Sequence, residues 1–408
     1  MPSEEMLGKY ADVAIQIGVG LEEGDRLFIR SSVDAIEFTR ILVERAYDAG
    51  AVNVDVLWKD DAISVARFSH GSVEASKVVS TGAAANLRAY EMGDLFLTVY
   101  AEDPNAMAGQ DVSRIGEFQR VNAEYLESLA NAFGSLEHQW SIVAAPTPSW
   151  AQSVFPEMEA TEAQELLWES IFRACRADSD DPVAEWNRHL SMLVRRRDYL
   201  SAREYVGLRY VGPGTDLRLG LPDDAVWQGG NGHTPDGRPF APNIPTEEVF
   251  VSPHMMKADG VVKATKPLSL FGNLVDDFSF ELANGEIVGA QAGVGQAILD
   301  ELLETDEGSR RFGEAAMVPM SSAVAAEGLV WNNTLYDEND GCHIAIGRSY
   351  PTTVKGGAEM NPEQRLDAGL NFSNVHVDFV VGSPDLTVFG VLADGGEEPV
   401  IESGEWAF

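Results

Sequence analysis

Strand-like and helix-like segments alternate over the first half of the chain. The strand-like segments are short β-rich runs, and segments with helical spacing, such as IEFTRILVERAYDAG (36–50), separate them. The runs cover 25–30, 52–58, 94–100 and 140–146. Strands that alternate with helices usually build a parallel sheet with helices packed on it, so this half predicts a parallel α/β domain. Gly50 lies where a helix C-cap is expected before the second run, which supports the assignment.

The second half has a different pattern. A helical stretch covers about 161–200, and from REYVGLRYVGPGTDLRLGL (203–221) onward short alternating strands are separated by frequent turns. This pattern is typical of antiparallel sheets. We therefore predict an α/β plus α+β protein, with an N-terminal parallel α/β domain (1–200) and a β-rich, largely antiparallel catalytic domain (201–408).

Two sequence features bear on ligand binding in these domains. Neither GxGxxG nor a Walker A sequence follows the strand-like runs, so the usual signature of a nucleotide site is missing. The loop GGNGHTPDGRPFAPNIP (229–245) is dense in glycine and proline, and loops of this length inside a domain are commonly functional.

Composition indicates a globular protein that does not cross a membrane. Hydrophobic residues make up 45% of the 408 residues, but no stretch approaches the roughly 18 uninterrupted apolar residues of a membrane span. The first twenty residues are acidic and amphipathic, unlike a secretory signal, which predicts the first helix of a cytoplasmic protein. Two cysteines, Cys175 and Cys342, are too few for a disulfide framework.

The formal net charge of -36 is spread along the whole chain. Nucleic acids and anionic lipids would be repelled by this charge, because binding them depends on lysine and arginine. Repulsion among these charges disfavours the folded state in dilute buffer. At 1 M salt the Debye length falls to about 3 Å, so most of the repulsion between surface charges is screened. We therefore predict a halophilic protein, from the salt-rich cytoplasm of an archaeon, whose melting temperature rises with KCl.

Two histidines near the C-terminus lie among acidic residues. In NFSNVHVDFVVG, His376 and Asp378 are two residues apart, so in a strand they project from the same face while Val377 and Phe379 face the core. A histidine and a carboxylate directed at one point are a common metal-binding arrangement. Taken alone, this short pattern more often means a surface ion pair. His343 lies in DENDGCHIAIG (337–347), where an acidic stretch leads into an apolar one.

Several acids of the second half lie in apolar or turn-rich sequence, and each alone is best explained as a turn residue or a helix cap. They are Glu247, Glu248, Glu314, Asp337 and Glu338. Two unit charges at about 4 Å repel each other by about 4 kcal/mol at an effective dielectric of 20. If four or five of these carboxylates converge, cations must lie between them.

Five separated motifs carry a resemblance to a known family. In order and spacing, they resemble the thermophilic-type metallo-aminopeptidases, peptidase family M29, and the similarity extends over essentially the full chain. The motifs are NIPTEEVFVSP (243–253), ADGVVKATKPLSLFGN (258–273), DEGSRRFGEAAMVP (306–319), NNTLYDENDGCHIAIGRSYP (332–351) and NFSNVHVDFVVGS (371–383). The resemblance implies an N-terminal α/β domain, a C-terminal β-rich catalytic domain and a homodimer.

The resemblance also implies a two-metal site and a reaction. Its metal ligands map onto Glu248, Glu314, His343, His376 and Asp378. Two divalent ions (Zn, Co or Mn) would generate a hydroxide that attacks the first peptide bond of substrates with a free N-terminus. Tyr350 would be a ligand or would stabilise the oxyanion, and Glu338 would be a ligand or the general base that passes the proton to the leaving amine.

Two alternatives stay open at this stage. Some proteins that resemble this family are mononuclear iron dioxygenases, whose triad could be His343, His376 and Asp378. Glu248, Glu314 and Tyr350 argue against this alternative, because one iron would leave carboxylates uncompensated. The other alternative is a non-catalytic metal-binding scaffold. Two metals, one iron or no metal per chain would separate the three hypotheses.

Overall fold

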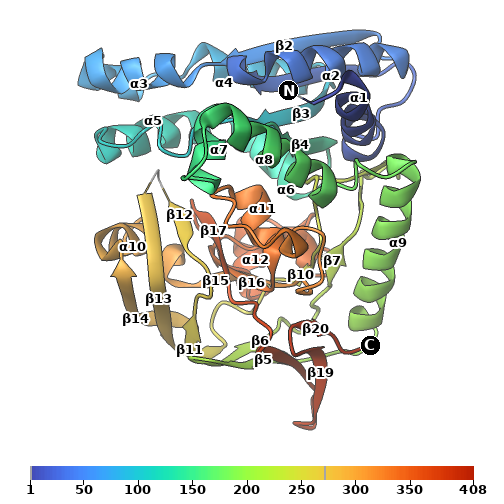
Figure 1. Cartoon of the computed structure of the whole chain (residues 1–408). Helices are drawn as coiled ribbons and strands as arrows, with labels where there is room; N and C mark the ends of the chain where they lie inside the picture. Colours follow the sequence, from blue (N-terminus) through green and yellow to red (C-terminus); the bar gives the residue numbers. More distant parts are fainter. Residues whose placement is uncertain (1, 271–272) are drawn as a thin grey trace. The chain divides into compact units, whose positions relative to one another are not determined.

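The computed structural model describes residues 2–270 and 273–408. The chain forms two compact units, of which unit 1 comprises Met1–Arg188 and Asn231–Pro245, and unit 2 comprises His189–Gly230 and Thr246–Phe408 (Figure 1). The boundary at residue 200 between two folding domains stays a prediction. Phe271 and Gly272 of the predicted motif at 258–273 lie outside the described residues.

A parallel sheet forms the centre of unit 1. Its strand order is β2-β1-β3-β4, and all neighbouring strands run parallel. The strands are β1 (Arg26–Ser32), β2 (Asn53–Lys59), β3 (Leu95–Tyr100) and β4 (Trp140–Ala144). They match the four predicted strand segments to within two residues at each end. The predicted parallel α/β part is therefore confirmed.

Helices pack on this sheet through aromatic side chains. Phe28 of β1 and Phe96 of β3 belong to one buried hydrophobic cluster with Leu129 of α6. Tyr10 of α1 stacks on Phe38 of α2 at 5.1 Å, and its hydroxyl donates a hydrogen bond to the Ala144 carbonyl of β4. The helices are α1 (Glu4–Asp12), α2 (Ile36–Asp48), α3 (Asp61–His70), α4 (Thr81–Glu91), α5 (Val112–Tyr125), α6 (Glu127–Gly134), α7 (Pro148–Val154) and α8 (Ala160–Ala174).

The Gly/Pro-dense loop at 229–245 is integrated mainly into unit 1. It contains the short antiparallel pair β8 (Gly232–His233) and β9 (Pro239–Phe240). Arg238 forms an ion pair with Asp25, 3.1 Å between Nη1 and Oδ1. These contacts give the loop a structural role, which the sequence pattern did not specify. Helix α9 (Pro182–Ser201) spans the division at residue 188.

Unit 2 is built from antiparallel sheets, as predicted. One sheet has the order β17-β16-β15-β10-β7, and a larger one has the order β12-β13-β11-β6-β5-β18-β19-β20 with β14 paired to β13. The strands are β5 (Gly207–Gly212), β6 (Thr215–Gly220), β7 (Gln228–Gly229), β10 (Val249–Val251), β11 (Ala258–Lys263), β12 (Leu268–Leu270), β13 (Asn273–Ala283), β14 (Glu286–Val294), β15 (Phe312–Met317), β16 (His343–Gly347), β17 (His376–Val380), β18 (Thr387–Val391), β19 (Glu397–Glu402) and β20 (Glu405–Trp406). The helices are α10 (Gln296–Leu303), α11 (Thr334–Asp337) and α12 (Pro362–Asp367).

An aromatic core supports the smaller sheet from behind. Phe379 of β17 and Phe312 of β15 pack against Phe280 and Phe278 of β13, with ring centroids 5.2 to 6.3 Å apart. All four rings are buried. Side chains on the opposite face of β15–β17 are therefore held on a rigid surface.

None of the helices within residues 2–270 and 273–408 is both long enough and apolar enough to span a bilayer.

Candidate metal centre

The strand register places four of the predicted ligands on one face of the smaller sheet. Glu314 on β15 is opposite Ala345 on β16, and Ala345 is opposite Asp378 on β17. Residues directly opposite in an antiparallel pair share a face, and so do residues two apart along a strand. His343 and His376 therefore project from the same face as Glu314 and Asp378. The small Ala345 side chain leaves space between the two carboxylates.

The side-chain distances show that Glu314 faces both histidines. Its Oε1 lies 3.9 Å from Nε2 of His343, and its Oε2 lies 3.2 Å from Nε2 of His376. Glu248, which immediately precedes β10, places Oε2 3.1 Å from Nε2 of His343. Asp378 places Oδ1 3.6 Å from Nε2 of His376. Two clusters of possible ligands result, Glu248–Glu314–His343 and Glu314–His376–Asp378, and they share Glu314.

Backbone carbonyls orient both histidine rings. Nδ1 of His343 lies 3.2 Å from the Gly341 carbonyl, and Nδ1 of His376 lies 2.7 Å from the Arg348 carbonyl. A carbonyl oxygen can only accept a hydrogen bond, so Nδ1 carries the proton in each neutral ring. Each Nε2 lone pair is then available to a cation, which is the usual arrangement behind histidine ligands.

The pKa values reflect an excess of buried negative charge. Burial opposes protonation of His343, but its carboxylate neighbours, with Glu248 foremost, outweigh burial and raise its pKa to about 10. Burial raises the pKa of Glu314 to about 7, against the effect of its hydrogen bond with His376. Burial also disfavours the Asp378 carboxylate, yet the charge of His376 holds its pKa below the usual range. The centre therefore favours protons or other cations among its acids.

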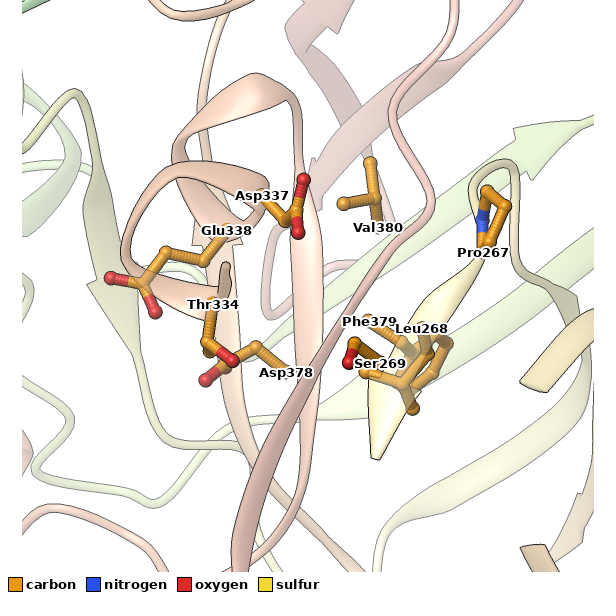
Figure 2. A pocket seen from close by; sticks show the side chains of 9 residues that line it. All are labelled: Pro267, Leu268, Ser269, Thr334, Asp337, Glu338, Asp378, Phe379 and Val380. Carbon is orange, nitrogen blue, oxygen red and sulfur yellow. The ribbon is translucent and has the colours of Figure 1, made fainter. Parts of the chain in front are cut away.

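Glu338 lies beside this centre, on the turn that follows α11. It lines a pocket together with Asp378 and with the segment Pro267–Ser269 (Figure 2). Burial, reinforced by the charges of Asp378 and Glu248, raises the Glu338 pKa well above its usual range. The raised pKa favours the protonated form of this carboxyl group beside the centre.

Tyr350 lies next to His376. Its ring lies 5.0 Å from the His376 ring, centroid to centroid, and 5.4 Å from Phe250. Burial raises the pKa of its hydroxyl, so the phenol stays protonated and able to donate a hydrogen bond. The structure thus brings all seven predicted site residues into one region of unit 2.

Two of the acids weighed in the sequence have other partners. Asp337 accepts hydrogen bonds from the backbone amides of Trp331 and Asn333, at 2.9 and 2.8 Å, which is the capping role expected of an isolated turn acid. Glu247 is buried, with Oε2 3.7 Å from Nε2 of His189. His189 lies on α9, to which the sequence analysis assigned no chemistry.

Sequence reasoning also missed two residues that anchor the Glu338 turn. Asn339 accepts a hydrogen bond from the Glu247 amide at 2.7 Å, and Lys266 forms an ion pair with Asp340. Neither link has a periodic signal, because each joins segments more than 70 residues apart.

The side chains at this centre fit divalent cations. Among the residues described, Oδ1 of Asp378 has no hydrogen-bond partner although it is buried between the two histidines. Histidine nitrogens and carboxylate oxygens together suit Zn, Co and Mn. Fold and site thus define a metal-dependent protein with its centre on an antiparallel sheet.

Comparison with known proteins identifies the family. The model of the thermophilic metalloprotease family (M29) matches residues 3–406, and the chain belongs to this family. Aminopeptidase 2 of Geobacillus stearothermophilus is 40% identical over 406 residues, which cover 99% of this chain and 98% of that protein. Aminopeptidase AmpS of Bacillus subtilis (strain 168) is 38% identical, with 99% of each chain covered.

A solved structure has the same fold as this chain. Wild-type AmpT from Thermus thermophilus superposes with a TM-score of 0.93 at 37% sequence identity, covering 99% of this chain and 100% of that chain. These matches confirm the predicted family, fold class and enzyme class, a metallo-aminopeptidase. None of the relatives described here supports the dioxygenase alternative.

Proposed function

We propose that the protein is an aminopeptidase that uses two divalent metal ions to hydrolyse the N-terminal peptide bond of peptides. One ion would be held by Glu248, Glu314 and His343, and the other by Glu314, His376 and Asp378. The observation that carries this proposal is the position of Glu314, whose two carboxylate oxygens face different histidines. A carboxylate shared in this way suits paired cations a few ångströms apart.

Bound cations of this kind lower the pKa of water from 15.7 to about 7 and polarise a carbonyl group. The chain supplies the remaining functions. Glu338, across the pocket from Pro267–Ser269, takes a proton from the attacking water and returns it to the leaving amine. The Tyr350 hydroxyl donates a hydrogen bond to the oxygen on which negative charge develops. The carboxylates attract the ammonium group of a substrate with a free N-terminus.

Metal removal tests the two-metal proposal. We expect EDTA to abolish hydrolysis of amino-acid p-nitroanilides and Co, Zn or Mn to restore it, because sites with open positions exchange their ions more readily than closed structural sites. Elemental analysis of the active protein should find two ions per chain. Full activity after verified metal removal would contradict the proposal, and one iron per chain would favour the dioxygenase alternative.

The proposal also requires a free substrate amine. We expect peptides with an acetylated N-terminus to be cleaved at least about 100-fold more slowly than the same peptides with a free one, because acetylation removes the charge and the lone pair of the amine. Release of the first amino acid, measured by mass spectrometry, checks this. Equal cleavage of both forms would indicate an endopeptidase.

The proposal includes three further features of the protein: its oligomeric state, its location and its domain division. The family resemblance supports a homodimer, and light scattering on the purified protein would report the oligomeric state. The acidic composition supports a cytoplasmic protein of a halophile. The change in sequence pattern near residue 200 supports independently folding domains 1–200 and 201–408, which limited proteolysis would test.

A further inference from the structure

Lys266 has no role in the proposed mechanism, although it lies close to the site. It lies between β11 and β12, and its ammonium group forms an ion pair with the carboxylate of Asp340. Asp340 is only 1% exposed, and among the described residues its oxygens have no hydrogen-bond partner besides this lysine. A buried carboxylate is costly unless it is paired, so Asp340 depends on Lys266.

The turn that contains Asp340 also carries Glu338. Its other side chains are fixed to separate parts of unit 2. Asp337 binds the backbone amides of Trp331 and Asn333, and Asn339 accepts from the Glu247 amide while its Nδ2 donates to the Leu335 carbonyl at 2.9 Å. The positive charge of Lys266 acts on Asp337 as well. Lys266 therefore interacts with one acid before Glu338 in the chain, Asp337, and with one after it, Asp340.

The charged side chains of the turn at 337–340 point in different directions. Figure 2 shows the Asp337 and Glu338 side chains leaving the turn in different directions, and both line the same pocket as Asp378. Pro267, Leu268 and Ser269, the residues directly after Lys266, line this pocket as well. The ion pair thus joins the segment that forms one part of the pocket to the turn that carries Glu338.

We infer that Lys266 is a positioning residue, which acts through Asp340 to hold Glu338 at the metal centre. The inference rests on the proposed role of Glu338 in proton transfer. A general base must lie within hydrogen-bond reach of the proton that it takes, and an anchored turn keeps the carboxyl group there. Without the ion pair the turn gains freedom, while the five proposed metal ligands lie on or next to strands that do not depend on it.

Lys266→Met removes the charge and retains most of the side-chain length. We expect kcat to fall about 10- to 100-fold, as for residues that support a metal site from behind, with KM changed less than about threefold and metal content unchanged. Lys266→Arg should recover most of kcat, because it keeps the positive charge. Amide hydrogen exchange of residues 337–340, measured on the metal-free protein, should be faster in Lys266→Met.

A double variant separates positioning from plain stability. Lys266→Met leaves a buried carboxylate unpaired, whereas Lys266→Met with Asp340→Asn removes both charges. We expect the double variant to recover the melting temperature while kcat stays low. Recovery of both would overturn the inference, because the pair would then serve stability alone. Lys263→Met is the matched control, since Lys263 pairs with Asp277 on the exposed surface at 2.7 Å.

The variant Glu338→Gln shows whether a failed prediction concerns the role of Lys266 or the proposed role of Glu338. If Lys266 acts through Glu338, adding Lys266→Met to Glu338→Gln should lower kcat no further. An inactive Glu338→Gln together with a wild-type kcat in Lys266→Met would overturn the role of Lys266 alone. A fully active Glu338→Gln would overturn the proposed role of Glu338, and the role of Lys266 with it.

Discussion

Replacing Glu314 with glutamine is expected to remove both metal ions from the protein and to lower kcat/KM by about 1000-fold or more. Glu314 contributes one oxygen to each ligand cluster, so the loss of its charge weakens both. Metal ions supply several kcal/mol of transition-state stabilisation, and about 1.4 kcal/mol corresponds to a tenfold change in rate. The size and shape of the side chain are nearly unchanged, so the aromatic core behind β15 should stay folded.

Glu248→Gln provides the contrast. Glu248 belongs only to the cluster with His343, so this variant should keep one ion, held by Glu314, His376 and Asp378. Elemental analysis of both variants, together with turnover of amino-acid p-nitroanilides, measures the difference. Glu286→Gln, an exposed acid at the start of β14, is the control for loss of one negative charge. Two ions retained in Glu314→Gln would contradict the shared role of this carboxylate.

Much of the fold follows from local sequence patterns. The four strands of unit 1 were predicted to within two residues at each end, because each is a short β-rich run separated from the next by a helical pattern. The common direction of His376 and Asp378 followed from the period of two residues in a strand. Local patterns also predicted the antiparallel character of unit 2, since frequent turns separate short alternating strands there.

The site geometry required information that local patterns lack. The position of Glu314 between two histidines depends on the order β17-β16-β15, which brings together residues far apart in the chain. In the turn at 337–340 no periodicity indicates direction, so the sequence could not show that Glu338 lines a pocket with Asp378, or that Asp337 accepts hydrogen bonds from the backbone of its own turn. The family resemblance indicated a set of ligands, but not what holds them in place.

The charge of the protein leads to the largest expected effect on stability. We expect the melting temperature to rise by about 10 °C or more between 0.05 and 2 M KCl, because salt screens repulsion among surface acids. The formal net charge is -36, and acidic residues outnumber basic ones 65 to 29. Each 1 kcal/mol shifts the melting temperature of a domain of 150–250 residues by about 2–4 °C, so relief of a few kcal/mol is sufficient.

Helix α2 offers a variant that tests whether screening is the cause. Glu44 and Asp48 are exposed, lie four residues apart on one helix face and carry like charges, and Asp48 is the last residue of the helix, where negative charge is unfavourable. Glu44→Gln with Asp48→Asn should raise the melting temperature in dilute buffer and have little effect in 2 M KCl. Sucrose stabilises proteins without screening charge, so it serves as the solvent control. A melting temperature that rises equally in sucrose and KCl, or that falls in KCl, would contradict the prediction.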